Sequence, residues 1–214
     1  MRVALFGGTF DPIHRGHLRL AAAAADSFAL HRVLFAPVGH QPLKSEGTLA
    51  SFQDRLEMTR LALASLPRQL QPTTSHSLDT CFTVSNLDAP NPDGTPNYTL
   101  DTLTALAFEF PAAHLFVLSG ADSFLDLRRW RSPDRLLALA EWIVVSRPEF
   151  PLTQAQLAPL ALTPAQRARV HLLTTLHEDV SATELRRRLR MGDPCPGLLP
   201  TPVAAYIRAH RLYL

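Results

Sequence analysis

The stretch VALFGGTFDPIHRGHL, residues 3–18, decides the fold and indicates the chemistry. Its first four residues form a short apolar run that is typical of a buried strand. Gly7 and Gly8 end that run, and two histidines, His14 and His17, follow three residues apart at the start of a helix-forming segment. A packed strand explains only the beginning of this stretch, so the glycines and histidines require a second explanation.

Apolar runs alternate with helical patterns along the rest of the chain. The expected strands are the apolar runs at residues 2–6, 32–38, 114–120, 142–146 and 170–175. The expected helices are those at residues 16–30, 51–66, 97–110 and 132–140, and two more from Ser181 and from about Pro202. Strands separated by helices of about a dozen residues indicate an α/β fold with a doubly wound parallel sheet. A small C-terminal helical portion is expected at about 181–214.

Helix-start signals support two of these helices. Ser51 suits an N-cap, with Asp54 three residues later, and Ser132 with Pro133 suits an N-cap followed by the first helical position. The Pro-, Gln- and Ala-rich segment 147–166 is expected to be a loop or flap rather than a domain boundary. With 214 residues, we expect one domain, 1–214.

Composition excludes several classes of protein. The chain has 46% hydrophobic and 19% charged residues, and its net charge of +2 does not by itself imply a nucleic-acid partner. The basic run at residues 185–190 is best explained as a solvated helix face. Cys81 and Cys195 lie far apart and outside any zinc-ligand spacing, and the apolar run at residues 20–25 is far too short to span a membrane. We therefore expect a soluble, cytoplasmic protein with no membrane or nucleic-acid partner.

The paired glycines suggest a phosphate site. In a doubly wound sheet, ligands bind beyond the carboxyl ends of the strands, and Gly7 and Gly8 follow the first strand directly. Glycine lets the backbone approach a phosphate closely, and the next helix offers unpaired N–H groups to an anion. No third glycine completes GxGxxG and no GK[ST] follows, so neither a dinucleotide-binding dehydrogenase nor a P-loop NTPase is supported.

His14 and His17 lie on one face of a starting helix because their spacing is i, i+3. Two imidazole N–H donors there could both point at a bound phosphate. The alternatives are a helix start with incidental histidines, or a zinc pair, which favours i, i+4 spacing and a nearby carboxylate. The strand and paired glycines in front of the histidines favour the phosphate interpretation.

Four motifs, in the same order, resemble the nucleotidyltransferase superfamily that carries the (H/T)xGH signature. GGTFDPIHRGH is similar to the version in bacterial nicotinate-nucleotide adenylyltransferases, and SGADSFLDLRRW resembles their GxDxxxxxxxW segment. VSATELRRRL resembles the ISSTxIR phosphate motif, and LLPTPVAAYIRAHRLY resembles the C-terminal signature. The resemblance implies a Rossmann-like nucleotidyltransferase fold and adenylyl transfer from ATP to nicotinate mononucleotide in NAD biosynthesis, giving deamido-NAD and pyrophosphate.

The resemblance also implies roles for individual residues. His14 and His17 would be catalytic. The residues implied to hold the phosphates of ATP are Gly7, Gly8, Thr9, Phe10, Lys44, Ser181, Thr183 and Arg186. Ser181 and Glu184 also satisfy a capping box, which alone would explain that tetrapeptide as a helix start. Leu43 stands where the resembling family usually has a histidine, and the sequence leaves open how this replacement affects the loop.

The remaining implied residues surround the second substrate. Asp122 follows a strand at its carboxyl end and would accept hydrogen bonds from a ribose hydroxyl. Trp130 would stack on the pyridine ring, although core packing is the commoner role of tryptophan. Tyr98, Thr99 and Arg131 complete the implied nicotinate pocket.

A phosphate monoester is already largely ionised at neutral pH, since its second pKa is about 6, so no general base is required. Mg²⁺ would be held mainly by ATP phosphates and water, and no dedicated protein metal site is expected.

The sequence leaves the oligomeric state open, a homo-oligomer included. The rival functions are a related nucleotidyltransferase acting on nicotinamide mononucleotide, phosphopantetheine or a sugar-alcohol phosphate, a non-catalytic nucleotide sensor, and an NAD-dependent dehydrogenase.

Overall fold

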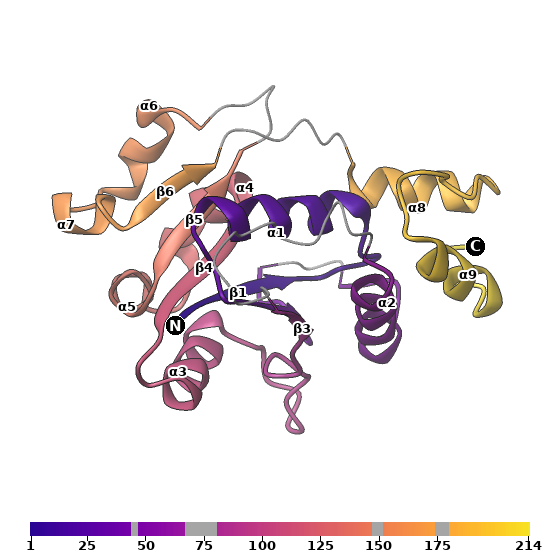
Figure 1. The fold of residues 1–214 in the computed structure, drawn as a ribbon, viewed down its shortest axis with the longest axis horizontal. Coiled ribbons are helices and arrows are strands. Elements are labelled where there is room, and N and C mark those ends of the chain that lie inside the picture. Colours follow the sequence, from indigo (N-terminus) through magenta and orange to yellow (C-terminus); the bar gives the residue numbers. More distant parts are fainter. Residues whose placement is uncertain (44–46, 67–80, 147–151, 174–179) are drawn as a thin grey trace.

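The computed structural model describes residues 1–43, 47–66, 81–146, 152–173 and 180–214. Within these residues a single parallel sheet has the strand order β3-β2-β1-β4-β5-β6 (Figure 1). Its strands are β1 (Arg2–Gly8), β2 (Arg32–Pro37), β3 (Cys81–Val84), β4 (His114–Gly120), β5 (Glu141–Val145) and β6 (Val170–Leu173). Every neighbouring pair is parallel, so all carboxyl ends lie at one edge. The predicted α/β fold with a doubly wound parallel sheet is confirmed.

Helices cover both faces of the sheet, as Figure 1 shows for α1 and α3. One core cluster contains residues of α1 (Arg15–Ser27), α2 (Phe52–Ala64), α8 (Ala182–Arg190) and α9 (Thr201–Ala209). The other contains residues of α3 (Thr99–Glu109), α4 (Ala121–Leu125), α5 (Pro133–Leu139) and α6 (Gln154–Leu157), and of the 3₁₀ turns η2 (Leu127–Arg129) and η3 (Ala158–Leu160). A last short helix, α7 (Pro164–Arg167), buries no residue.

Side-chain alternation along the central strand supplies both cores. Ala4 and Phe6 of β1 lie in the first cluster, whereas Val3 and Leu5 lie in the second. Successive side chains of a strand point to opposite faces, which makes a strand buried on both sides read as a continuous apolar run. The buried face of α1 is rich in alanine, and these small side chains let the helix pack closely on the sheet.

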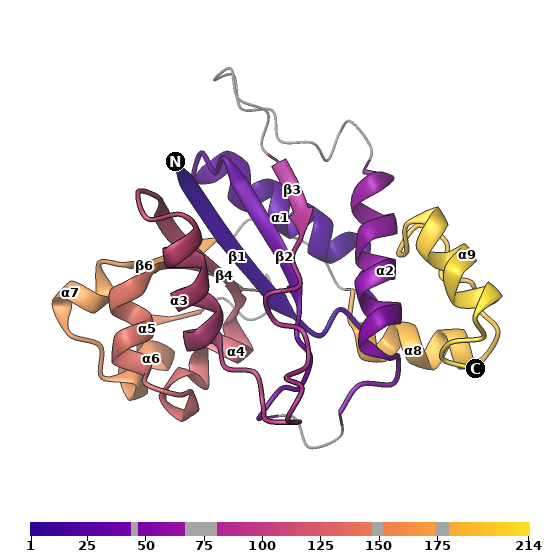
Figure 2. The ribbon, with the colours of Figure 1, turned by 90° about the horizontal axis from the view of Figure 1, so that it is seen from below.

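The C-terminal helices lie beside α2 rather than over the centre of the sheet, as Figure 2 shows for α8 and α9. Tyr206 of α9 donates a hydrogen bond of 2.9 Å from its hydroxyl to Oδ1 of Asp54 in α2. Buried leucines of α8 join the first core cluster. The division of the chain into one domain, 1–214, with a C-terminal helical portion stays a prediction.

Two sequence expectations need correction. β3, with only four residues, is too short for its pattern to be recognised, and it forms as an edge strand through pairing with β2. Within 147–166, the described part holds α6, η3 and α7 instead of an uninterrupted loop. Ser132 and Pro133 do occupy the N-cap and first helical positions of α5, as predicted, although the Ser132 side chain, at a φ of 52°, makes no capping hydrogen bond. At Ser51 the predicted cap is confirmed, since its hydroxyl accepts a bond of 3.1 Å from the Asp54 N–H.

Candidate active site

Residues 7–17, which we call the signature loop, connect the end of β1 to the start of α1. β1 lies between β2 and β4, and the strand order reverses at this point of the sheet. In doubly wound sheets this reversal opens a crevice beyond the carboxyl ends of the strands, where ligands bind. The topology therefore places the signature loop where a nucleotide would be expected.

The two histidines of the signature loop lie against each other. His14 is the N-cap of α1 and His17 lies in its first turn. Their rings stack with centroids 3.7 Å apart and planes inclined by 25°. The backbone N–H of His14 also donates to Nδ1 of His17 over 3.3 Å. The prediction that the i, i+3 spacing brings the two imidazoles together is confirmed.

This geometry fixes the protonation of His17. Burial lowers the pKa of His17 well below its ordinary value, and the neighbouring His14 lowers it further. The ring is therefore neutral at pH 7. Because its Nδ1 accepts a hydrogen bond, the ring proton resides on Nε2. His17 thus offers one N–H donor without bringing a positive charge of its own.

Two glycines leave room in the signature loop for different purposes. A Cβ at Gly16 would lie 3.0 Å from Nδ1 of His14, so glycine makes space for that buried imidazole. A Cβ at Gly7 would meet no atom within 4 Å, so packing does not require glycine there. Open space beside the backbone of Gly7 is consistent with close approach by a ligand.

Phe10 was expected among the phosphate-binding residues, and its side chain is not available for that role. The ring is 1% exposed and packs edge-on against His17, with centroids 5.0 Å apart and planes inclined by 85°. The same ring also packs edge-on against that of Phe6, with the ring centroids 5.3 Å apart. The Phe10 ring therefore supports the His17 imidazole.

Two arginines hold the backbone of the signature loop from different helices. Arg55 of α2, which is 1% exposed, donates from Nη1 to the carbonyl of Thr9 over 2.7 Å. Burial lowers the pKa of Arg55, and the negative charge of Asp11 opposes that shift. Arg186 of α8 donates from Nη1 to the carbonyl of Asp11 over 2.8 Å, and from Nη2 to Oγ1 of Thr183 over 3.2 Å. The start of α8 is therefore tied to the signature loop.

The start of α8 does not form the capping box that its sequence suggests. Ser181 occupies the N-cap position, but its side chain makes no capping hydrogen bond. Glu184 instead pairs with Arg187, with distances of 2.7 and 2.6 Å to its guanidinium. The capping-box explanation is wrong because Arg187 competes for the glutamate one turn away. The first turn of α8, with Ser181, Thr183 and Arg186, stays available as an anion site.

The residues expected at the nicotinate lie around the starts of α3 and α5. Arg131 places its guanidinium 4.8 Å from the centroid of the Tyr98 ring, and its Nη1 lies 3.5 Å from Oδ2 of Asp101. Trp130 is partly buried, with its ring centroid 5.7 Å from that of Trp142. Tyr98 and Thr99 stand at the start of α3 and are also partly buried.

The remaining expected site residues are Asp122 and those of the loop after β2. Asp122 lies exposed in α4, directly beyond the carboxyl end of β4. Leu43 is 39% exposed at the end of a described segment. Lys44 lies outside the described residues, so its expected phosphate contact stays a prediction.

Hydrogen bonds join residues 39–40, after β2, to residues 88–97, before α3, and we call this contact the rim of the candidate site. Asn97 accepts from the His40 N–H at 2.8 Å through Oδ1 and donates from Nδ2 to the Ala89 carbonyl, also at 2.8 Å. Gly39 donates its N–H to the carbonyl of Asp88 over 2.7 Å. These bonds join the segment after β2 to the segment before α3. The resemblance implies that the region of Asn97 to Thr99 helps to distinguish the substrate, but the bonds that Asn97 makes to distant segments appear only in the structure.

Replacing Gly39 with alanine is expected to lower the free energy of unfolding by about 1–3 kcal/mol. The added Cβ would lie 2.5 Å from Pro90 N and 2.7 Å from Oδ1 of Asn97, and the proline backbone cannot move aside cheaply. Chemical denaturation measures the change. Gly120→Ala is the matched control, because its Cβ meets no atom within 4 Å. Equal stability of the two variants would show that the rim is not tightly packed.

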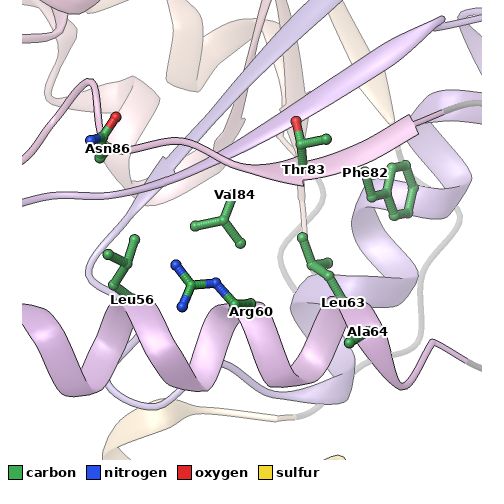
Figure 3. Close-up of a pocket in the computed structure, with 8 residues that line it drawn as sticks. All are labelled: Leu56, Arg60, Leu63, Ala64, Phe82, Thr83, Val84 and Asn86. Carbon is green, nitrogen blue, oxygen red and sulfur yellow. The ribbon is translucent and has the colours of Figure 1, made fainter.

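A pocket of about 460 Å³ lies elsewhere, between α2 and the edge strand β3. Figure 3 shows its lining side chains, among them Leu56, Arg60 and Val84. No residue of the signature loop lines it. Since the signature loop follows β1 and Asp122 follows β4, both at the carboxyl edge of the sheet, we place the candidate active site there and not in this pocket.

The model of a cytidylyltransferase-like family matches residues 5–188. A relative in Thermus thermophilus named "Probable nicotinate-nucleotide adenylyltransferase" is 38% identical over 213 residues, covering 100% of both chains. One of the same name in Corynebacterium kroppenstedtii is 37% identical, covering 100% of this chain and 91% of the relative. The chain belongs to the nicotinate-nucleotide adenylyltransferase family.

The fold agrees with that of solved members of the adenylyltransferase family. A structure of the Plasmodium falciparum nicotinic acid mononucleotide adenylyltransferase complexed with NaAD superposes with a TM-score of 0.75 at 17% identity. The match covers 99% of this chain and 97% of that chain. At this identity the likeness shows the shared Rossmann-like fold. The family resemblance predicted from the four motifs is confirmed.

The described parts of the chain contain neither a cluster of metal ligands nor a membrane-spanning helix. No group of three or more His, Cys, Asp and Glu side chains there could hold a metal ion. No helix in the same residues is long and apolar enough to cross a membrane. Asp11, the carboxylate nearest to the histidines in sequence, already accepts hydrogen bonds on both oxygens, which makes it a poor metal ligand.

Proposed function

We propose that this chain transfers the adenylyl group of ATP to nicotinate mononucleotide, giving deamido-NAD and pyrophosphate. The observation that carries the proposal is the stacked pair His14 and His17 behind the paired glycines, with Arg186 reaching the same loop from α8. The names of the relatives support the choice of substrates. The reaction belongs to NAD biosynthesis.

The chemistry requires little from the protein beyond positioning and electrostatic stabilisation. An oxygen of the mononucleotide phosphate attacks the α-phosphorus of ATP. The bond between this phosphorus and the oxygen that bridges the α- and β-phosphates breaks, and pyrophosphate leaves. The attacking phosphate is already ionised at neutral pH, since its second pKa is about 6. Charge gathers on the α-phosphoryl oxygens in the transition state and must be met by preorganised donors.

His17 suits that task as a neutral donor. Its Nε2–H would donate to an oxygen of the α-phosphoryl group, while the backbone of His14 and the ring of Phe10 hold the imidazole in place. The stacked His14 would contribute a second contact on the same side. Donors that are fixed before the reaction need no reorganisation when the charge develops.

The first turn of α8 would hold the triphosphate. Ser181 and Thr183 provide hydroxyls at a helix N-terminus, where backbone N–H groups and the helix dipole favour an anion. Arg186 provides paired donors suited to phosphate oxygens. Gly7, Gly8 and Thr9 would supply close backbone contacts, and Lys44 an additional charge.

The second substrate would lie between the starts of α3 and α5. Tyr98 and Thr99 would face the nicotinate carboxylate, with Arg131 beside them, and Trp130 would present a face to the pyridine ring. Asp122 would accept hydrogen bonds from a ribose hydroxyl. We propose that Mg²⁺ enters with the phosphates of ATP, held mainly by their oxygens and water, and reduces the repulsion between the two polyanions.

A pyrophosphate-release assay with ATP and a panel of phosphate acceptors tests the proposal. We expect turnover with nicotinate mononucleotide and a clear preference for it over nicotinamide mononucleotide. Activity only with nicotinamide mononucleotide or phosphopantetheine would assign a related nucleotidyltransferase reaction instead. ATP binding with no turnover on any acceptor would indicate a nucleotide sensor.

A further inference from the structure

Tyr213, which follows α9, is buried against the signature loop. Its side chain is 7% exposed, and its hydroxyl donates to Oδ1 of Asp11 over 2.6 Å. The two residues are 202 positions apart in the sequence. Burial and the negative charge of Asp11 both raise the pKa of Tyr213, so its hydroxyl stays protonated and acts as the donor. A charge-assisted bond in a buried place is short and directional.

Asp11 joins three segments of the chain at one carboxylate. Its Oδ2 accepts from the Leu49 N–H at 2.8 Å, and its Oδ1 accepts from the Ala50 N–H at 3.1 Å as well as from Tyr213. Asp11 is 3% exposed, so water cannot easily replace a lost donor. Its backbone carbonyl meanwhile accepts from Arg186. Four hydrogen bonds therefore hold Asp11 in position.

The backbone on both sides of this contact is in an uncommon conformation. Phe10, the neighbour of Asp11, has a φ of 47°, and Tyr213 has a φ of 64°. Left-handed conformations of bulky residues persist only where the surrounding structure holds them in place. The buried hydrogen bond between Asp11 and Tyr213 is one of the contacts that does so.

We propose that Tyr213 is a positioning residue for adenylyl transfer, which through Asp11 fixes the segment that carries the imidazoles of His14 and His17. This inference rests on the proposed function, because the positioned groups are those assigned to the α-phosphoryl contact. His14 lies three residues after Asp11, and Phe10, one residue before Asp11, packs against the His17 ring. A displacement of Asp11 is thus transmitted to both histidines.

The expected consequence is a loss of rate rather than of binding. Contacts to the developing charge depend on donor placement within fractions of an ångström, whereas ground-state binding of ATP draws on many other groups. Removing one hydroxyl donor to a buried carboxylate is expected to lower kcat about tenfold. The KM values for ATP and for the mononucleotide should change no more than about twofold, since they do not depend mainly on the imidazoles.

The test compares Tyr213→Phe with wild-type protein by steady-state kinetics over both substrates. Tyr206→Phe is the matched control, because it also removes a tyrosine hydroxyl that donates to an aspartate, Asp54, outside the signature loop. Tyr206→Phe should keep wild-type kcat. Circular dichroism and assay temperatures well below each melting midpoint keep the comparison on folded protein.

A double-mutant cycle with Asp11→Asn distinguishes positioning from general destabilisation. If the hydroxyl acts through Asp11, Tyr213→Phe should lower kcat much less in the Asp11→Asn background than in wild type. Wild-type kcat in folded Tyr213→Phe, or equal losses in Tyr213→Phe and Tyr206→Phe, would overturn the inference. If wild-type protein has no adenylyl transfer activity, the proposed function fails and the inference falls with it, whereas normal kcat in folded Tyr213→Phe beside an active wild type overturns the inference alone.

Discussion

Replacing His17 with alanine is expected to lower kcat about 10²–10³-fold while leaving the Kd for ATP nearly unchanged. The neutral ring with its proton on Nε2 makes its best contact only when charge develops on the α-phosphoryl oxygens. An interaction that is stronger in the transition state than in the ground state appears in kcat rather than in binding. Single-turnover kinetics at saturating ATP and equilibrium ATP binding measure the two quantities separately.

Two further variants sharpen the test of His17. His17→Gln offers an amide N–H near the position of Nε2 and should retain more activity than His17→Ala. His210→Ala removes an exposed histidine that stacks on Tyr206, away from the signature loop, and should leave kcat unchanged. Normal turnover of His17→Ala would remove His17 from the mechanism.

Replacing Arg186 with alanine is expected to lower kcat/KM for ATP about 10²-fold, because charge-assisted bonds contribute about 1.5–3 kcal/mol each. The change removes the proposed phosphate donor and also the bond of 2.8 Å to the carbonyl of Asp11. Both losses act on the same site, so we expect kcat and KM for ATP to change together. Initial rates over a range of ATP concentrations measure the effect.

The neighbouring arginine provides the control. Arg187 is one residue further along α8, its side chain is 58% exposed, and it pairs with Glu184 on the surface. Exposed ion pairs contribute about 0–1 kcal/mol, so Arg187→Ala should have kinetics close to wild type. Similar losses in both variants would mean that the net charge of α8, and not a specific contact of Arg186, supports ATP use.

The sequence predicted features that depend on spacing within one segment. The alternation of apolar runs and helices gave the α/β fold, and Ser51 was recognised as an N-cap from its own four residues. The stacking of His14 and His17 is also local, because the N-cap residue of α1 lies next to the third residue of the helix. Such features are local because 3.6 residues per turn, or a period of two, fixes which side chains meet.

Features that depend on competition or distance were not predictable. Glu184 satisfies a capping pattern, yet it pairs with Arg187, and no sequence rule decides between two partners of similar reach. β3 becomes a strand only through its pairing with β2. Asn97, which links the segments around the rim, has no recognisable motif because its partners come from elsewhere in the chain.

The amino-acid sequence by itself determined that a glycine turn and two histidines stand at the end of the first strand, and it indicated the family. Only the tertiary structure showed that Tyr213 reaches Asp11 across 202 residues and that Arg186 reaches the same loop across 175. A helix or turn needs only its neighbours, whereas a long-range hydrogen bond forms only after the sheet and both core clusters have brought distant segments into contact.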